Sequence, residues 1–550
     1  MNRRLRYIYT ILLLGLLVFS FSVQAQGDGD IATPAGEFPI VTEPTVLKIL
    51  LSSGDAHVAD FNNNNYTQWL EEKTGVDLQI EVVIGADAQT KLNLALASGD
   101  LPDILLGFPV TASLLSQQGA EGTFLPLNDL MEKYGYETKR VFEVERPQLL
   151  PLNTSPDGNI YGLPEINECF HCFLSQKLWV YKPWLDKLGI AMPTTTDEFE
   201  AMLMAFKDQD PNGNGIADEV PFSGSVDGQG GWHNSVDQNL MNAFVFYDRI
   251  QHDRLLLIND KIEAAYAQPG YREGLRYLHR LYTEGLIDPN GLIQDNAALL
   301  QLGSQMDPHL LGSASGGWMG TYTIAQTVAQ GGEMDNWIAI PPLKGPEGVQ
   351  TAAYAPWGFS VGRCVITNKS AHPDVAFRLC DLMYSNEATM RNVFGVEDLD
   401  WVKPPEGELG IDGSQAAYRT LGNWDADITT THWRQVGMTY RTSEFRLTQS
   451  AVDQFVEVPL YIASNDMLPY APPIEDLIPP LTFGDNESRE LTEVQLSVKT
   501  YVDEMLTRFI TGDSDIETEW DSYLTTLDSQ GLPRLLEIYQ AAYDTQKAVS

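Results

Sequence analysis

The chain has 550 residues, of which 43% are hydrophobic and 20% charged, and its formal net charge is −40. One hydrophobic core stops growing at roughly 250 to 300 residues, so at least two compact units are expected and a single small domain is excluded. The acidic surface repels the phosphates of DNA and RNA, which argues against nucleic acid as a partner.

The first residues are typical of a cleaved export signal. Three arginines at positions 3–6 precede an apolar stretch over residues 7–22, and Val23-Gln24-Ala25 resembles a cleavage site. The polar residues that follow at once disfavour a membrane-spanning helix. We therefore expect residues 1–25 to be a signal peptide and the mature protein to be periplasmic or extracellular. No cysteine stands near the cleavage point, so no lipid anchor is expected.

Strand-like and helix-like segments alternate in the first part of the mature chain. Residues 26–45, rich in Gly, Asp, Pro and Thr, predict a flexible lead-in, with order beginning near Val46. The alternating segments are apolar strands at 47–51, 78–84 and 103–106 and helices at 66–73 and 88–97, closed by Gly75 and Gly99. This succession predicts right-handed βαβ units and a parallel sheet, with ligands at the carboxyl ends of its strands.

The same alternation returns further along the chain, so the predicted fold class is α/β. The predicted elements are strands at 178–181, 337–340 and 358–361, a helix that Thr195 and Glu198 open as a capping box, and a helix at 373–384. The C-terminal region is mostly helical, with apolar stripes ending at Gly512 and Gly531.

Four cysteines in an exported chain indicate two disulfides. We expect Cys169 to pair with Cys172, and Cys364 with Cys380, the latter where a helix packs on a strand. The Cys-Phe-His-Cys motif could also indicate redox catalysis or zinc binding. The strand at 178–181 argues against a cysteine pair that opens a helix, and a second pair of zinc ligands is missing.

Several segments in order resemble the family-1 extracellular solute-binding proteins of ABC importers. The resemblance is strongest to the long subgroup with lipoprotein-like and alginate-oligosaccharide-binding members. The segments that carry it are Lys91–Asp103, Asp157–Pro164, Trp184–Ile190 with Pro193–Phe199, Asp210–Glu219, Ile340–Pro346, and Phe509–Gly512 with Trp520–Tyr523.

The resemblance implies a two-lobed, periplasmic-binding-protein-like fold with a hinge and a helical C-terminal region. By that analogy, residues 46–165 plus 320–395 form an N-terminal lobe, and residues 166–319 plus 396–550 form a C-terminal lobe. The implied function is the extracytoplasmic substrate-binding component of an ABC transporter. The resemblance also implies that the protein is a monomer, that it captures an oligosaccharide in the interlobe cleft, and that it delivers this sugar to membrane permease subunits.

A secreted carbohydrate-active hydrolase is the alternative function. It needs two carboxylates that face the scissile bond, and 75 acidic residues mark no particular pair. Short signatures of other hydrolases, such as Gly-x-Ser-x-Gly or His-Glu-x-x-His, do not occur in the sequence. We therefore expect a binding protein and not an enzyme.

Aromatic side chains in polar or Gly-rich loops are candidates to stack on a sugar ring. Those of first rank are Trp232, Trp318, Tyr322 and Trp357, and those of second rank are Trp424 and Trp433. For each of them, ordinary packing is the alternative.

The segment 210–219 predicts a structural calcium site. The loop has oxygen ligands at alternate positions: Asp210 at one, Asn212 at three, Asn214 at five, the carbonyl of Ile216 at seven and Asp218 at nine. Gly215 at position six permits the sharp turn, and Glu219 follows at position ten. A second register begins at Asp208, with Gly213 at six and Glu219 at twelve. We prefer the first register, which the resemblance supports. A solvated Asn-Gly turn without metal is the alternative.

Overall fold

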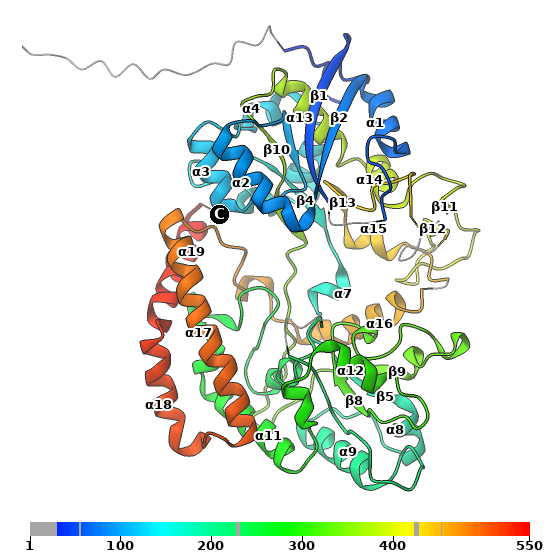
Figure 1. The fold of residues 1–550 in the computed structure, drawn as a ribbon, viewed down its shortest axis with the longest axis vertical. Helices are drawn as coiled ribbons and strands as arrows, with labels where there is room; N and C mark the ends of the chain where they lie inside the picture. The colour runs from blue at the N-terminus through cyan, green and yellow to red at the C-terminus, as the bar shows by residue number, and fades with distance from the viewer. Residues whose placement is uncertain (1–29, 54–56, 227–230, 423–427, 453, 550) are drawn as a thin grey trace, which may run out of the picture.

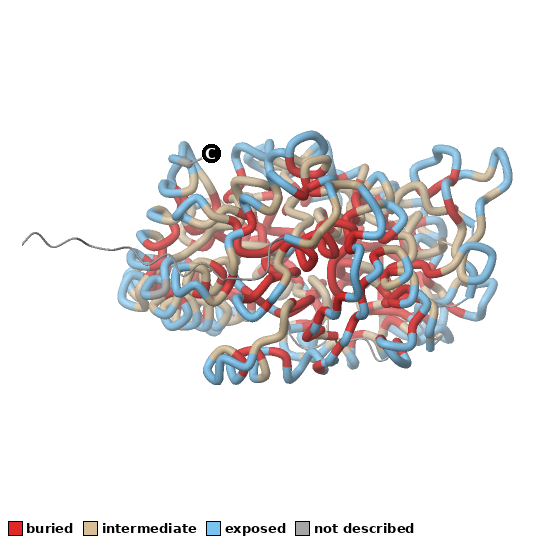
Figure 2. Tube along the Cα trace, turned by 90° about the horizontal axis from the view of Figure 1, so that it is seen from above, coloured by how far each residue is buried: buried red, intermediate tan, exposed pale blue. Residues whose placement is uncertain are grey.

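In the computed structural model the described residues are 30–53, 57–226, 231–422, 428–452 and 454–549. They form the two-lobed α/β fold predicted from the sequence, with the lobes one above the other in Figure 1. Buried segments fill the interior and exposed loops surround them (Figure 2). The expected signal peptide lies outside the described residues. Of the helices within these ranges, none is both long enough and apolar enough to cross a membrane.

The upper lobe is built on a six-stranded sheet in the order β13-β4-β10-β3-β1-β2. Its strands are β1 (Thr45–Ser53), β2 (Val76–Ile84), β3 (Ile104–Leu106), β4 (Leu163–Asn167), β10 (Phe359–Ile366) and β13 (Tyr440–Arg441). β1 lies parallel to both β2 and β3, as predicted. β10 is antiparallel to β3 and β4, so the sheet is mixed and not wholly parallel. Because β10 enters from the lower lobe, it starts at the edge where β3 ends.

Both faces of this sheet are buried. Ile49 and Leu51 enter one apolar core, whereas Leu50 between them enters another on the opposite face. The helices of the lobe are α1 (Asn65–Thr74), α2 (Ala88–Ser98), α3 (Ala112–Ala120), α4 (Asn128–Tyr134), α5 (Glu137–Lys139), α6 (Leu149–Leu152), α13 (Pro373–Leu382) and α14 (Asn386–Phe394). The predicted disulfide Cys364–Cys380 joins β10 to α13.

Residues 30–45 are folded against α13, so the expectation of a flexible lead-in is wrong for this described part. The buried carboxylate of Asp374 accepts the N–H groups of Ile31 and Ala32, both at 2.7 Å. Arg378 donates to the Glu37 carbonyl at 2.7 Å, and Ile40 is fully buried. Polar contacts with distant residues therefore order a segment that has no apolar periodicity of its own.

The lower lobe holds a small antiparallel sheet in the order β8-β5-β9. Its strands are β5 (Leu178–Tyr181), β8 (Ser313–Ser315) and β9 (Trp337–Ile340), and a separate hairpin joins β6 (Leu255–Ile258) to β7 (Lys261–Ala264). The helices are α8 (Lys182–Leu188), α9 (Thr196–Asp208), α10 (Asp237–Leu240), α11 (Pro269–Thr283) and α12 (Asn296–Gly303). The Thr195 hydroxyl accepts the N–H of Glu198 and caps α9, as predicted. In a capping box the Glu198 carboxylate would accept the N–H of Thr195, but here it accepts that of Thr194.

Three C-terminal helices complete the lower lobe and share its core. They are α17 (Asp485–Thr511), α18 (Ile516–Ser529) and α19 (Leu532–Val549), drawn in orange and red in Figure 1. α17 ends at Gly512, as its stripe predicts. α17 packs along α11 and also reaches α3 of the upper lobe, where Ser488 and Ser113 hydroxyls lie 3.4 Å apart.

In the described chain, the backbone passes between the lobes three times, at residues 168–177, at residues 341–358 and at the described residues of 448–456, and we call these three crossings the hinge. Two ranges pack in the lobe opposite to the one expected from the sequence. Residues 320–340 contribute Tyr322 and Trp337 to the lower core. The described residues of 396–447 lie in the upper lobe, where Trp433 and Tyr440 enter the core. β9 and β13 pair with strands far away in the sequence, which local patterns do not indicate.

Replacing Asp374 with alanine should release the N-terminal segment, because the Ile31 and Ala32 N–H groups lose their acceptor. The expected cost is about 1–3 kcal/mol of stability. The measurement is the hydrogen-exchange protection of the backbone amides of residues 31–41, which should fall in Asp374→Ala. Asp129→Ala, on the exposed face of α4, is the control and should keep this protection. Unchanged protection in Asp374→Ala would contradict this account of the segment.

Candidate functional site

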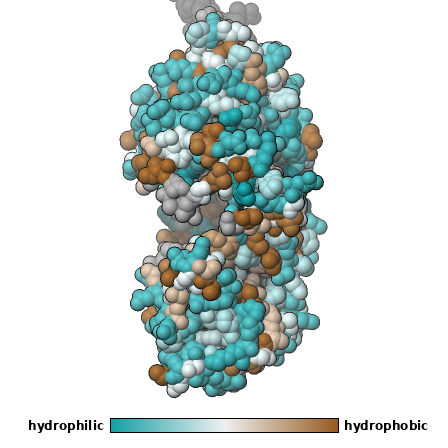
Figure 3. All heavy atoms as spheres, turned by 90° about the vertical axis from the view of Figure 1, so that its right-hand side faces the viewer, coloured by the Kyte–Doolittle hydropathy of each residue, from teal (hydrophilic) through white to brown (hydrophobic). Residues whose placement is uncertain are grey.

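A cavity of about 320 Å³ lies in the upper lobe where the parallel strands end. Ser52 and Ser53 end β1, Gly85 follows β2 and Gly107 follows β3, and all four line it. The carboxyl ends of parallel strands are the expected place for a ligand in such a sheet. Figure 3 shows that the molecular surface is hollowed between the two lobes.

Glu165 and Arg363 supply the charged groups of this cavity, and Gln435 adds an amide. Arg363 Nε lies 3.4 Å from Glu165 Oε2, and its guanidinium also donates to the Gly107 carbonyl at 3.0 Å. Burial raises the pKa of Glu165, although Arg363 opposes this shift. A carboxylate and a guanidinium fixed side by side offer acceptors and donors to the hydroxyl groups of a ligand.

Trp232 borders the hinge from the lower lobe. Asn234 anchors its loop by donating to the Ser315 carbonyl at 2.8 Å. The indole ring lies on Gly317, because a Cβ there would come within 2.3 Å of the ring. The ring centroid is 6.3 Å from that of His171 in the first crossing. Trp232 is only partly buried, so it is available to stack on a ligand.

The other aromatic candidates are not all placed for such a role. Tyr322 and Trp433 are fully buried, so neither reaches a ligand in this conformation. Trp318 is partly buried and packs on the lower core. Trp357 lines a separate cavity of about 10 Å³ with Tyr354 and Leu477. Trp424 lies outside the described residues.

Sequence reasoning missed Glu165, Arg363 and Gln435. Glu165 and Arg363 interrupt apolar strand segments, Leu163-Pro-Glu-Ile and Val361-Gly-Arg-Cys-Val. A charged residue inside a buried strand needs a partner or a function, and this signal could have found both.

The predicted calcium loop is organised around Asp210. One oxygen of its carboxylate accepts the N–H of Gly213 at 2.8 Å, and the other accepts that of Gly215 at 3.1 Å. Asp208 is the last residue of α9 and is exposed. The chain therefore turns about Asp210, which favours the register that begins there.

The other predicted ligands of the loop lie around Asp218 and Glu219. The Asn212 and Asn214 amides donate to Asp218 at 2.9 and 3.0 Å. Both carboxylate oxygens of Glu219 are buried and make no hydrogen bond. Burying an unpaired carboxylate is costly, and calcium, which takes six to eight oxygen ligands, would satisfy it. The Asp210, Asp218 and Glu219 carboxylates do not all lie within 4.8 Å of one another.

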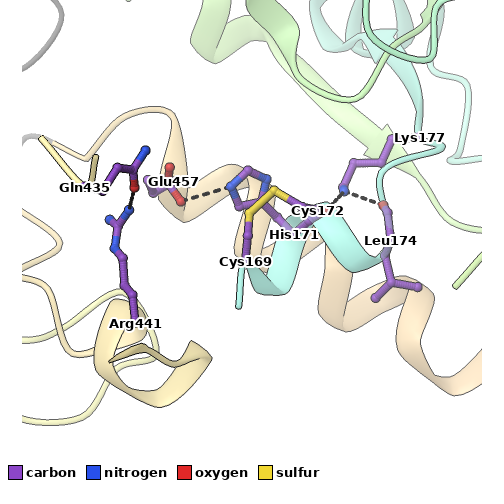
Figure 4. Close-up of a disulfide and its surroundings, with 8 residues drawn as sticks. All are labelled: Cys169, His171, Cys172, Leu174, Lys177, Gln435, Arg441 and Glu457. Carbon is purple, nitrogen blue, oxygen red and sulfur yellow. Dashed lines mark hydrogen bonds and ion pairs between the residues drawn. A yellow bond between two sulfur atoms is a disulfide. The ribbon is translucent and has the colours of Figure 1, made fainter. Parts of the chain in front are cut away.

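The second predicted disulfide, Cys169–Cys172, lies in the first crossing (Figure 4). Contrary to the expectation from sequence, Cys169 precedes a helical turn, α7 (Phe170–Phe173), before β5 begins. α7 packs on α16 (Glu457–Met467), where His171 Nε2 lies 3.3 Å from Glu457 Oε2. Burial opposes ionisation of Glu457, but the His171 imidazole and nearby Arg446 hold its pKa at about 2.

Lys177 closes the same turn from the other side. It is 1% exposed, and its Nζ donates to the carbonyls of Leu174 and His171, the latter at 2.8 Å. Burial lowers the pKa of the Lys177 amine to about 7 from its ordinary 10.5.

A model of the family described as bacterial extracellular solute-binding protein matches residues 55–390. The chain is also similar to the fructooligosaccharide ABC transporter substrate-binding protein FusA of Streptococcus pneumoniae serotype 4. The two are 27% identical over 531 residues, which cover 93% of this chain and 92% of FusA.

Solved structures agree with this similarity. FusA of S. pneumoniae in complex with kestose superposes with a TM-score of 0.70 at 26% identity, over 92% of this chain and 100% of FusA. An EF-hand mutant of FusA in complex with fructo-nystose gives 0.69 at 25% identity, with the same coverage. A solute-binding protein from Bifidobacterium longum subsp. infantis shares the fold, with a TM-score of 0.76 at 22% identity over 92% of this chain and 98% of its own.

Stability should depend on pH through Lys177. Between pH 10.5 and about 7 the unfolded chain binds a proton at this amine and the folded chain does not, so stability falls as pH falls through that window and is level below it. Lys177→Met removes this contribution.

The thermal midpoint of the wild type minus that of Lys177→Met should therefore decrease as pH is lowered across the window. A difference that stays constant from pH 10.5 to 7 would show that Lys177 titrates normally.

Proposed function

Because the chain belongs to the bacterial extracellular solute-binding protein family, we propose that it is the extracytoplasmic substrate-binding component of an ABC importer. In this role the protein is a monomer that captures an oligosaccharide between its lobes. It then delivers the sugar to the membrane permease subunits. The carrying observation is the cavity at the carboxyl ends of β1, β2 and β3, with Trp232 at the hinge from the other lobe.

A neutral oligosaccharide is the ligand class that we favour. The cavity pairs one carboxylate, Glu165, with one guanidinium, Arg363, so its charges balance. A uronic sugar would require an excess of positive charge at the site, and the strongly acidic chain repels anions at a distance. The similarity to FusA, a fructooligosaccharide-binding protein, supports the same class.

Binding without catalysis is also part of the proposal. Hydrolysis of a glycosidic bond needs two carboxylates on opposite sides of it. Among the described residues that line the cavity, Glu165 is the carboxylate, and it is already paired with Arg363. The site therefore supports recognition of hydroxyl groups better than acid and base chemistry.

We propose that calcium occupies the loop 210–219 through Asp210, Asn212, Asn214, Asp218, Glu219 and the carbonyl of Ile216. The buried, unpartnered oxygens of Glu219 support this assignment. The ion would be structural, since it would fix the turn after α9. The structures of FusA include an EF-hand mutant, which agrees with a calcium loop in a related protein.

The purified mature protein should bind short neutral oligosaccharides in the micromolar range or tighter, without turnover. Calorimetry against matched fructooligosaccharides and uronic oligosaccharides is the measurement, with product analysis of each mixture. Tighter binding to the uronic set would overturn the neutral preference, and hydrolysis of any glycoside would overturn the assignment as a binding protein.

Trp232→Ala should weaken that binding about tenfold or more, because a stacking surface is lost. Gly317→Ala should weaken it too, since the new methyl group must displace the Trp232 ring. Trp69→Ala is the matched control, because Trp69 stacks on Tyr66 in the upper lobe, away from the hinge. Equal affinity in Trp232→Ala and the wild type would remove Trp232 from the site.

Calcium should raise the thermal midpoint, and excess chelator should lower it again. At a concentration about 100 times its Kd, a bound ligand contributes about 2.7 kcal/mol. Glu219→Gln should abolish most of this response, whereas Glu284→Gln, on an exposed residue, should keep it. An unchanged midpoint together with no calcium in elemental analysis would exclude the site.

A further inference from the structure

The Cys169–Cys172 disulfide lies in the first crossing, outside the cavity assigned to the ligand. β4 ends at Asn167 in the upper lobe, and β5 begins at Leu178 in the lower lobe. The turn between them packs against α16, which belongs to the third crossing and its continuation. A change in the bonding of this turn would therefore alter the packing of the hinge.

Three side chains of metal-binding type meet in the turn. Of the described residues, Cys169, His171 and Cys172 form a group whose ligand atoms all lie within 4.8 Å of one another. Both ring nitrogens of His171 are buried; Nε2 lies 3.3 Å from Glu457 Oε2, whereas Nδ1 has no hydrogen-bond partner. Figure 4 shows this ring beside the S–S bond. A buried ring nitrogen without a partner is costly, so the position of Nδ1 requires an explanation.

We propose that Cys169, His171 and Cys172 bind a zinc ion when the disulfide is reduced. Two thiolates and one imidazole form a tetrahedral zinc site with water as the fourth ligand, and zinc-binding cysteine pairs use the C-x2-C spacing. Nε2 of His171 faces Glu457, so Nδ1 is the nitrogen for the metal. The Nε2–H group then donates to the Glu457 carboxylate, which fixes the tautomer of the metal ligand.

Positively charged side chains near the turn balance the charge of the proposed zinc site. Zinc with two thiolates is neutral, and the Glu457 carboxylate makes the assembly negative by one charge. Arg441 and Arg446 line the same cavity of about 30 Å³ as His171 and Glu457. The Nε of Arg441 is buried and has no hydrogen-bond partner. Positive charge near a cysteine favours its thiolate over its thiol, and thiolates are the form that binds metal.

Reduction and metal binding are two separate steps. A thiol or phosphine reductant supplies two electrons, two protons are taken up, and the disulfide becomes two thiols while the reductant is oxidised. Zinc then binds both sulfurs, and the two thiol protons leave to solvent.

The disulfide and the metal are thus alternative crosslinks of one turn. Each joins Cys169 to Cys172 across three positions of the chain. In the reduced, metal-loaded protein, α7 therefore keeps the constraint with which it packs on α16 in the hinge. Without metal, reduction would leave the turn uncrosslinked.

Cobalt(II) is a direct probe, because thiolate-bound tetrahedral cobalt absorbs visible light strongly and oxygen-bound octahedral cobalt does not. The full-length protein is reduced with a phosphine, desalted without oxygen and titrated with cobalt in excess calcium, which occupies oxygen sites such as the loop 210–219. We expect intense tetrahedral bands that saturate at one equivalent and disappear on addition of zinc.

The same protein in its oxidised form is the matched control and should show no such bands. His171→Asn should weaken cobalt binding about tenfold or more, whereas His372→Asn, at the start of α13, should leave it unchanged. Absence of the bands in the reduced wild type would overturn the proposal. Bands of equal affinity in His171→Asn, or bands that persist in Cys169→Ser, would overturn it too.

Discussion

The two lobes share one hinge because the chain passes between them three times. Leu174 of the first crossing and Ala352 of the second meet Met467, at the end of α16, in one small apolar cluster. The upper sheet depends on this arrangement, since β10 and β13 join β4 only after the chain has built most of the lower lobe. Any motion of one lobe against the other must bend the three crossings together, which favours opening and closing about a common axis.

Local features of the fold could be predicted from the sequence, and long-range features could not. Gly75 and Gly99 end helices in the left-handed conformation because a residue without a Cβ adopts it at no cost. The direction of β10 depends on where the chain re-enters the upper lobe. Likewise, the order of residues 30–45 depends on Asp374, which lies 343 positions beyond Ile31 in the chain.

The candidate site divides in the same way. The calcium loop, predicted from the spacing of oxygen ligands within a short segment, stays a prediction, whereas both predicted disulfides are formed. The aromatic candidates all stand in polar or Gly-rich sequence segments, but burial separates the partly buried Trp232 from the fully buried Tyr322 and Trp433. Burial depends on which segments fold over a ring, so composition alone cannot make that distinction. Glu165 and Arg363 meet only because β4 and β10 are neighbours in the sheet.

Closure of the lobes around an oligosaccharide is the central claim, and small-angle X-ray scattering tests it most directly. The account predicts that the radius of gyration falls when a saturating neutral oligosaccharide is added to the calcium-loaded protein. It also predicts that an equal concentration of a monosaccharide that does not bind leaves the radius unchanged. A radius that stays constant while calorimetry shows the site to be saturated would contradict capture by closure.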